Sequence, residues 1–117
     1  MAAREHRIYK LPFAAVYPLY EEKVGKKGRT KDELDAALRW LTGYDDIELR
    51  DHVAAGTTLA EFFAGARPDP NVSKITGIVC GVRVEDIEDP LMQQIRYMDK
   101  LVDELARGKA LEKVLRS

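Results

Sequence analysis

The sequence predicts a mainly α-helical single domain spanning residues 1–117, a compact bundle of about five or six short helices. Two observations support this prediction. Residues with helix-capping spacing precede apolar side chains that recur every three or four positions. Segments with the alternation of a strand are short and lack an evident pairing partner. Because 45% of the residues are hydrophobic, the chain can fill a core.

The first quarter is expected to start with a short extended N-terminal arm at residues 8–11 and to continue as a helix after Pro12. The apolar residues of this helix follow helical spacing until Gly25 and Gly28 end it. Pro18 has no amide hydrogen to donate, so the helix should either bend at this residue or restart there.

Capping sequences mark the starts of the next helices. Thr30 with Glu33, and Thr58 with Glu61, have the spacing of capping boxes, and Asp45 can cap a helix between them. The apolar residues carried by this middle helix are Ile47, Leu49 and Val53. Three consecutive helices are therefore predicted between residues 30 and 65.

The last third contains one ambiguous segment and one strong helix. Residues 72–82 are β-branched like a strand but also have apolar spacings of three and four, and we favour short helical turns because a strand partner is missing. Asp89 can cap a long helix with Pro90 in its first turn. The apolar residues of this helix recur at alternating steps of four and three, and they are Leu91, Ile95, Met98, Val102 and Leu105. A short final helix is expected at residues 110–115.

Composition excludes several classes of protein. The net charge of -1 provides no overall attraction to nucleic acid or anionic membranes, and the single cysteine cannot form an internal disulfide. No apolar run approaches the roughly 20 residues of a membrane span, and the opening residues lack the apolar stretch of a signal peptide. A cytoplasmic protein is expected. Phosphate-binding loops and dinucleotide fingerprints are absent, so no cofactor is predicted.

Cys80 is the first candidate for chemistry, because Gly81 would allow close approach of a ligand and Arg83 could stabilise a thiolate. Its apolar neighbours favour a buried, inert thiol instead, and neither histidine is close in sequence. A ligand site around Cys80, Arg83, Glu85 and Asp86 is the functional alternative.

Four carboxylates lie within five residues at positions 85–89 and could bind a divalent cation or act in acid-base chemistry. Acidic residues before a helix also cap it and complement its dipole, and we favour that interpretation. The glycine at the sixth position of a calcium loop is absent. No metal site is predicted.

A basic run is the second candidate site. Residues 1–31 contain eight basic and three acidic groups, whereas residues 32–64 contain two basic and eight acidic groups. The candidate anion or partner patch consists of Lys23, Lys26, Lys27, Arg29 and Lys31. The following helix could accept phosphate at its first amides, but Asp32, Glu33 and Asp35 oppose nucleic acid there. A solvated loop beside the acidic segment is favoured.

Several short segments resemble a bacterial family known as domain of unknown function 2200. The segments that carry the resemblance are residues 7–10, 16–20, 26–31, 40–44, 75–85 and 88–92. The most specific of them are residues 80–85 and 89–92. The resemblance implies a small, mostly helical bacterial cytosolic protein, and it implies no activity, ligand or catalytic residue.

The favoured hypothesis is a small cytosolic binding or interaction module without catalytic activity. The charge difference between the first and second quarters suggests a protein partner or self-association, and a membrane partner is not expected. The alternatives are a ligand-binding protein or enzyme with a site at Cys80, Arg83 and Glu85, and a weak nucleic-acid binder through residues 23–31.

Overall fold

The computed structural model describes residues 7–116. Its α-helices are α1 (Phe13–Gly25), α2 (Lys31–Thr42), α3 (Asp46–Ala55), α4 (Leu59–Ala64), α5 (Pro90–Ala106) and α6 (Leu111–Val114). Three short 3₁₀ helices are η1 (Arg7–Lys10), η2 (Pro70–Lys74) and η3 (Val84–Asp86). The strands β1 (Ile78–Val79) and β2 (Val82–Arg83) form one antiparallel hairpin. The predicted mainly helical fold is confirmed.

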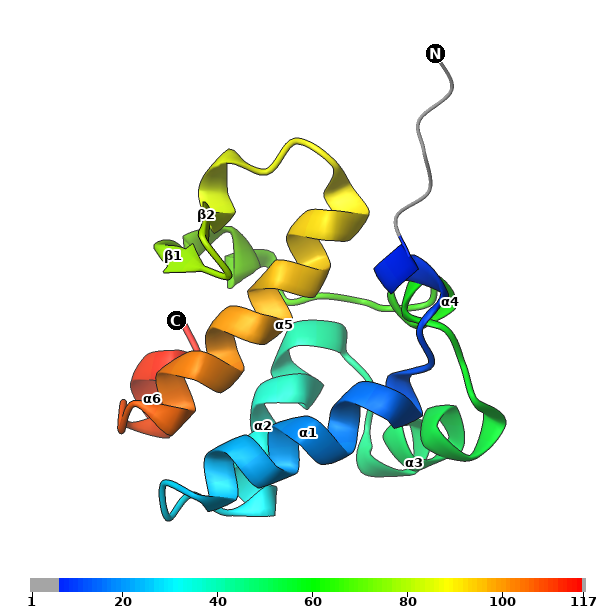
Figure 1. Cartoon of the computed structure of the whole chain (residues 1–117), viewed down its shortest axis with the longest axis horizontal. Coiled ribbons are helices and arrows are strands. Elements are labelled where there is room, and N and C mark those ends of the chain that lie inside the picture. Colours follow the sequence, from blue (N-terminus) through cyan, green and yellow to red (C-terminus); the bar gives the residue numbers. More distant parts are fainter. Residues whose placement is uncertain (1–6, 117) are drawn as a thin grey trace.

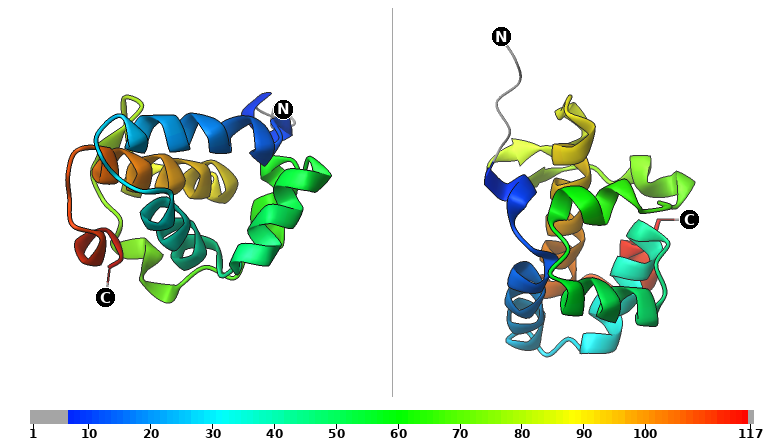
Figure 2. Two further views of the ribbon diagram at one scale, coloured as in Figure 1. Left: turned by 90° about the horizontal axis from the view of Figure 1, so that it is seen from below. Right: turned by 90° about the vertical axis from the view of Figure 1, so that its right-hand side faces the viewer.

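Helix α5 lies at the centre of the arrangement (Figure 1). It packs against α1 and α2, which also contact each other, and the hairpin and η3 cover its first half. Figure 2 shows α1 beside α5, with α3 and α4 together at the far end of the molecule from α6. The three longest helices thus surround most of the core.

Aromatic and aliphatic side chains fill the core between these helices. The rings of Phe13 and Phe62 stack with centroids 4.2 Å apart, and neither residue has exposed surface. The apolar face predicted for the long helix is buried as expected, with Ile95, Met98 and Leu105 at most 1% exposed. Burial of this stripe explains why α5 is stable at the centre of the fold.

The predicted caps are all formed. Thr30 and Thr58 each accept a hydrogen bond from the amide three residues later, and the glutamates at those positions accept from the cap amides. Asp45 forms a third capping box with Glu48, and Asp89 accepts from the amide of Leu91. Local sequence therefore sets where α2, α3, α4 and α5 begin.

The first segment differs from the prediction in its extended arm, and of the two alternatives predicted at Pro18 the restart is excluded. Residues 7–10 form a 3₁₀ turn, and the extended backbone is confined to the next residues, which bridge the start of α4. The Phe13 amide donates to the Thr57 carbonyl and the Leu59 amide to the Leu11 carbonyl. Helix α1 runs through Pro18 without restarting.

Residues 72–82 were predicted as short helical turns, and this is wrong beyond η2. The hairpin pairs Ile78 with Arg83 and Val79 with Val82, so the missing strand partner is the adjacent segment. Cys80 and Gly81 have φ of +51° and +78°, as the two central residues of a type I′ turn require. Gly81 is therefore explained by the turn itself.

Ile47 on α3 does not face the core. Its side chain is 63% exposed on α3, whereas Leu49 on the same helix is 5% exposed. Helix α3 is only partly amphipathic, because one apolar residue lies on its outer surface.

Candidate functional site

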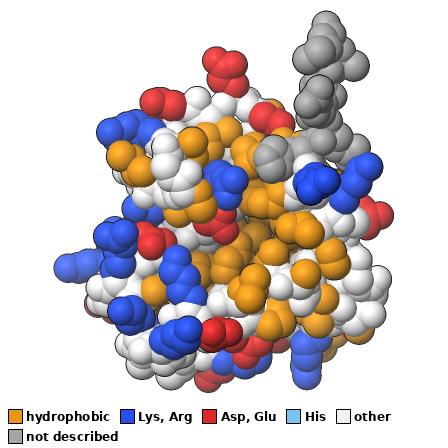
Figure 3. Space-filling view, viewed as in Figure 1, with side chains coloured by type: hydrophobic (Ala, Val, Ile, Leu, Met, Phe, Trp, Pro, Cys, Tyr) orange, Lys and Arg blue, Asp and Glu red, His pale blue; other side chains and the backbone are white. Residues whose placement is uncertain are grey.

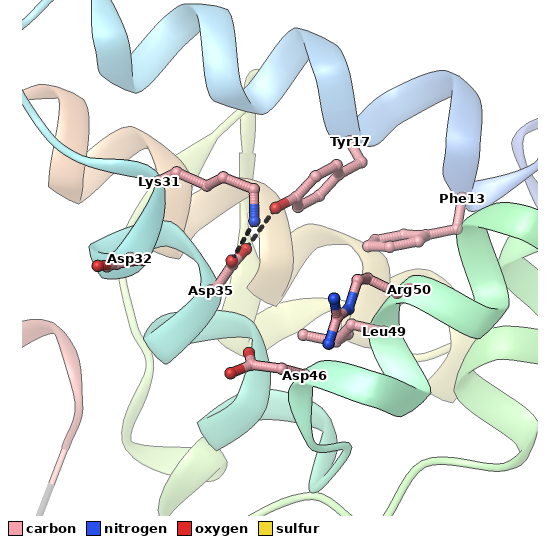
Figure 4. A pocket seen from close by; sticks show the side chains of 8 residues that line it. All are labelled: Phe13, Tyr17, Lys31, Asp32, Asp35, Asp46, Leu49 and Arg50. Carbon is pink, nitrogen blue, oxygen red and sulfur yellow. Dashed lines mark hydrogen bonds and ion pairs between the residues drawn. The ribbon is translucent and has the colours of Figure 1, made fainter.

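A depression of about 370 Å³ lies between α1, α2 and α3. Its lining residues are Phe13, Tyr17, Lys31, Asp32, Asp35, Asp46, Leu49 and Arg50. The apolar members lie at its base, where Phe13 has no exposed surface and Leu49 is 5% exposed. The charged members surround this base (Figure 4). The depression combines an apolar base with a few converging polar groups, as small-molecule sites do.

One wall of the depression is a three-residue network. The Tyr17 hydroxyl on α1 donates to Asp35 on α2 at 2.5 Å, and Lys31 donates to the other Asp35 oxygen at 2.6 Å. The Lys31 ammonium also lies 5.6 Å from the centre of the Tyr17 ring. Asp35 is 8% exposed, so both contacts satisfy a buried carboxylate.

This network keeps its donors protonated. Burial, followed by the hydrogen bond to Asp35, raises the pKa of Tyr17 to about 12. The hydrogen bond to Asp35 also raises the pKa of Lys31 above its ordinary value. At neutral pH the wall therefore presents a phenol and an ammonium with fixed charge states.

The opposite wall comes from the first turns of α3. Asp46 pairs with Arg39 of α2 at 2.7 Å. Arg50 reaches from α3 toward the middle of the depression, whereas Asp32 points away from it (Figure 4). Neither Arg50 nor Asp32 forms an ion pair with a residue in the part of the chain that the structure describes. Arg50 is therefore a cation available to a ligand.

The structure places the residues of the predicted site around Cys80 on the β1–β2 hairpin and in η3. Cys80 is exposed at the hairpin tip, so the favoured interpretation of a buried thiol is wrong. The turn geometry places the thiol outside the core, 3.9 Å from the Asp99 carboxylate. Arg83 pairs with Glu85 at 3.7 Å instead of with the thiol.

Around the thiol, Asp99 already has other partners. It accepts from the Tyr20 hydroxyl at 2.5 Å and from Arg96 at 2.8 Å. Burial, then the charge of Asp99, raises the pKa of Tyr20 well above its ordinary value. Cys80 therefore lies beside a structural network joining α1 to α5.

The neighbouring carboxylates have local structural roles. Glu85 accepts a hydrogen bond from the amide of Gly77 at 2.9 Å, across the base of the hairpin. Asp89 caps α5 and also accepts from the Tyr9 hydroxyl. Asp86 lies exposed in η3, at the end of the hairpin. Within residues 7–116, no group of three or more His, Cys, Asp or Glu side chains could hold a metal ion.

The residues of the basic run have three different roles in the structure. Arg29 is the one with a largely buried side chain. Its side chain is 14% exposed and pairs with Glu33 at 2.6 Å. It also donates to the carbonyls of Leu105 and Lys109 at 3.0 and 2.7 Å. These carbonyls lie at the carboxyl end of α5, where a cation complements the helix dipole. Arg29 thus joins the α1–α2 loop to α5.

Among the lysines of the run, Lys23 lies on α1, and Lys26 and Lys27 lie in the turn that follows it. Lys23 pairs with Asp103 at 3.5 Å and Lys26 with Glu22 at 3.0 Å, and Lys27 is exposed. These lysines and the 61% exposed Leu19 border a second depression of about 260 Å³. Figure 3 shows basic and acidic side chains side by side where α1 ends. Only Lys31 belongs to the first depression.

The pair of Arg29 and Glu33 makes stability depend on acid pH. Hydrogen bonds from Arg29, then from the Thr30 amide, lower the pKa of Glu33 from 4.5 to about 2. Because the folded pKa is the lower one, this stabilisation is present at neutral pH and is lost as the pH falls from about 4.5 to about 2.

We therefore expect the urea midpoint to fall over this pH range in the parent protein and to fall less in Glu33→Gln. Glu112→Gln, at an exposed position of α6, is the matched control and should keep the parent slope. Equal slopes for the parent and Glu33→Gln would contradict this prediction.

Comparison with known proteins identifies the family. The family described as "Uncharacterized protein conserved in bacteria (DUF2200)" matches residues 7–116. The chain belongs to this family. The crystal structure of the uncharacterized protein SP1917 is similar, with 42% identity, a TM-score of 0.89, and coverage of 97% of this chain and 93% of that chain. No curated protein matches.

The family match confirms the resemblance found in the sequence and leaves the activity unassigned. No helix among the described residues is both long and apolar enough to cross a membrane. For this member of DUF2200, the geometry of the depression between α1, α2 and α3 is therefore the basis for a functional proposal.

Sequence reasoning missed most residues of this depression. The spacing of Lys31 and Asp35, four apart on one helix, was a usable signal for their ion pair. Asp46 and Arg50 are also four apart on one helix, but no comparable signal links them to Tyr17, since α1 and α3 meet only through packing.

Proposed function

We propose that the protein is a non-catalytic binding module whose ligand site is the depression between α1, α2 and α3. The observation that carries this proposal is the combination of a buried apolar base with polar groups fixed around it. At about 370 Å³, the depression falls at the lower end of the range of small-molecule pockets, which is about 300–1,000 Å³. A ligand of modest size fits this site.

Preorganisation supports a binding role. Asp35 is held by Tyr17 and Lys31, and Asp46 is held by Arg39, so these side chains keep their positions before a ligand arrives. A site whose groups are already ordered loses less conformational entropy on binding. The three helices that carry the groups also pack against one another or share the core.

The ionisation of the site favours binding over proton transfer. General acid-base catalysis works best when a group has a pKa near the working pH. The pKa of Tyr17 is raised to about 12 by burial, and that of Lys31 is raised by Asp35. Both groups remain protonated at neutral pH and serve as fixed hydrogen-bond donors.

A fragment titration tests the proposal. We expect small amphipathic fragments to cause saturable NMR shifts at the amides of α1, α2 and α3 that border the depression. Asp46→Trp should abolish these shifts, because an indole at this exposed rim position fills the depression. The matched control is Asp51→Trp, which adds the same bulk at an exposed position of α3 outside the lining.

Binding that survives Asp46→Trp, or saturable shifts confined to another surface, would contradict the proposed site. Asp46→Asn removes the ion pair with Arg39 without adding bulk, and it should retain fragment binding. This variant separates blocking of the depression from loss of the pair.

A further inference from the structure

The charges around the depression differ in whether they already have a partner. Lys31 and Asp35 neutralise each other at 2.6 Å, and Asp46 is neutralised by Arg39 at 2.7 Å. Among the residues described, Arg50 and Asp32 have no oppositely charged partner, and Asp32 points away from the depression (Figure 4). The guanidinium of Arg50 is therefore the one lining charge that is both unpaired and directed inward.

An unpaired guanidinium selects a particular kind of ligand group. Its planar donors match the two oxygens of a carboxylate, with which arginine forms bidentate hydrogen bonds. Lys31 and Tyr17 are less available, since both already donate to Asp35. A ligand anion is thus expected at Arg50, on the α3 side of the depression.

The surrounding acids limit the charge of that anion. Asp46 lies on the turn of α3 preceding Arg50, and Asp35 lies on the opposite wall. Each of these carboxylates is already paired with a cation, so the single positive charge of Arg50 is the one left for a ligand to balance. A monoanion balances this charge, whereas a dianion adds an excess negative charge beside the two aspartates. Inorganic phosphate, which is a mixture of monoanion and dianion at neutral pH, is disfavoured relative to a monocarboxylate.

The remaining lining specifies the body of the ligand. The half-buried ring of Tyr17 offers an aromatic surface, and the buried side chains of Phe13 beside it and Leu49 below support this ring and the base. A volume of about 370 Å³ holds about a dozen non-hydrogen atoms, at the roughly 30 Å³ that a molecule of liquid water takes. A single substituted ring is of this size, and rings pack well against tyrosine.

We infer that the ligand of this depression is a small organic monocarboxylate with a flat or aromatic body. Its carboxylate pairs with Arg50, and its ring lies against Tyr17. This inference rests on the proposed binding function and adds the chemical class of the ligand.

Calorimetry and NMR titration of the whole protein with four small-molecule probes test the inferred chemical class of the ligand. The probes are phenylacetate, benzyl alcohol, benzylamine and inorganic phosphate. We expect phenylacetate to bind in the depression at least tenfold more tightly than each of the other three. Arg50→Gln should weaken phenylacetate binding at least tenfold, and Arg107→Gln, at another exposed arginine, should leave it unchanged.

Arg50 is exposed and makes no ion pair with the described residues, so Arg50→Gln should keep the parent melting temperature. Tighter binding of benzylamine, benzyl alcohol or phosphate in the depression would overturn the ligand class and leave the binding function standing. Unchanged phenylacetate affinity in Arg50→Gln would also overturn the class. Failure of all four probes to bind there would overturn the class and count against the function too.

Discussion

Gly43→Ala is expected to lower the free energy of unfolding by about 3 kcal/mol, because two penalties combine at this residue. Gly43 ends α2 with a φ of +76°, a left-handed conformation that disfavours side chains. An added Cβ would also lie 2.3 Å from the carbonyl oxygen of Arg67. The Arg67 amide donates to the Thr42 carbonyl at 2.6 Å, so this backbone cannot easily move away.

Gly56→Ala is the matched control, and chemical denaturation followed by circular dichroism is the measurement. Gly56 ends α3 with a φ of +66°, but an added Cβ would have no atom within 4 Å. Gly56→Ala should lower the free energy of unfolding only by the cost of the left-handed conformation, about 1–2 kcal/mol. If both variants lowered the free energy of unfolding equally, the backbone at Arg67 would have moved away from the added Cβ without cost, which would contradict the prediction.

Arg29→Ala is expected to lower the free energy of unfolding by about 2–3 kcal/mol. The substitution removes hydrogen bonds to Glu33 and leaves the carbonyls of Leu105 and Lys109 without this donor. Arg29 is only 14% exposed, so the loss of its contacts with Glu33 and the end of α5 is more costly than the loss of an exposed ion pair.

Lys27→Ala is the control for charge, since Lys27 is an exposed neighbour in the same basic run. Its unfolding free energy should stay close to that of the parent. Arg29→Lys keeps the charge but not the planar set of donors, and it should fall between Arg29→Ala and the parent. If Arg29→Ala and Lys27→Ala had the same free energy of unfolding, Arg29 would contribute no more than an ordinary surface residue, and the prediction would be wrong.

The helix starts could be read from sequence because capping is local. Thr30, Asp45, Thr58 and Asp89 each hydrogen-bond to an amide two or three residues away, whatever the rest of the fold does. The hairpin could not be predicted in the same way. Strands of two residues are too short for alternation to be visible, and their pairing depends on positive φ at Cys80 and Gly81.

The candidate sites were harder to predict than the helices. Arg29 was grouped with neighbouring lysines, because the sequence does not reveal that the carboxyl end of α5 lies beside it. The apolar neighbours of Cys80 in the sequence predict a buried thiol, but the turn places this residue on the surface. In both cases the deciding partner is distant in sequence or depends on backbone geometry.

The sequence by itself determined the helical class, the capped starts of α2 to α5 and the apolar stripe of α5, since caps and periodicity act within a few residues. It also carried the resemblance to the family. Only the tertiary structure placed Tyr17, Asp35 and Arg50 around one depression. Three helices must pack together before these side chains meet, and such packing is a property of the whole core.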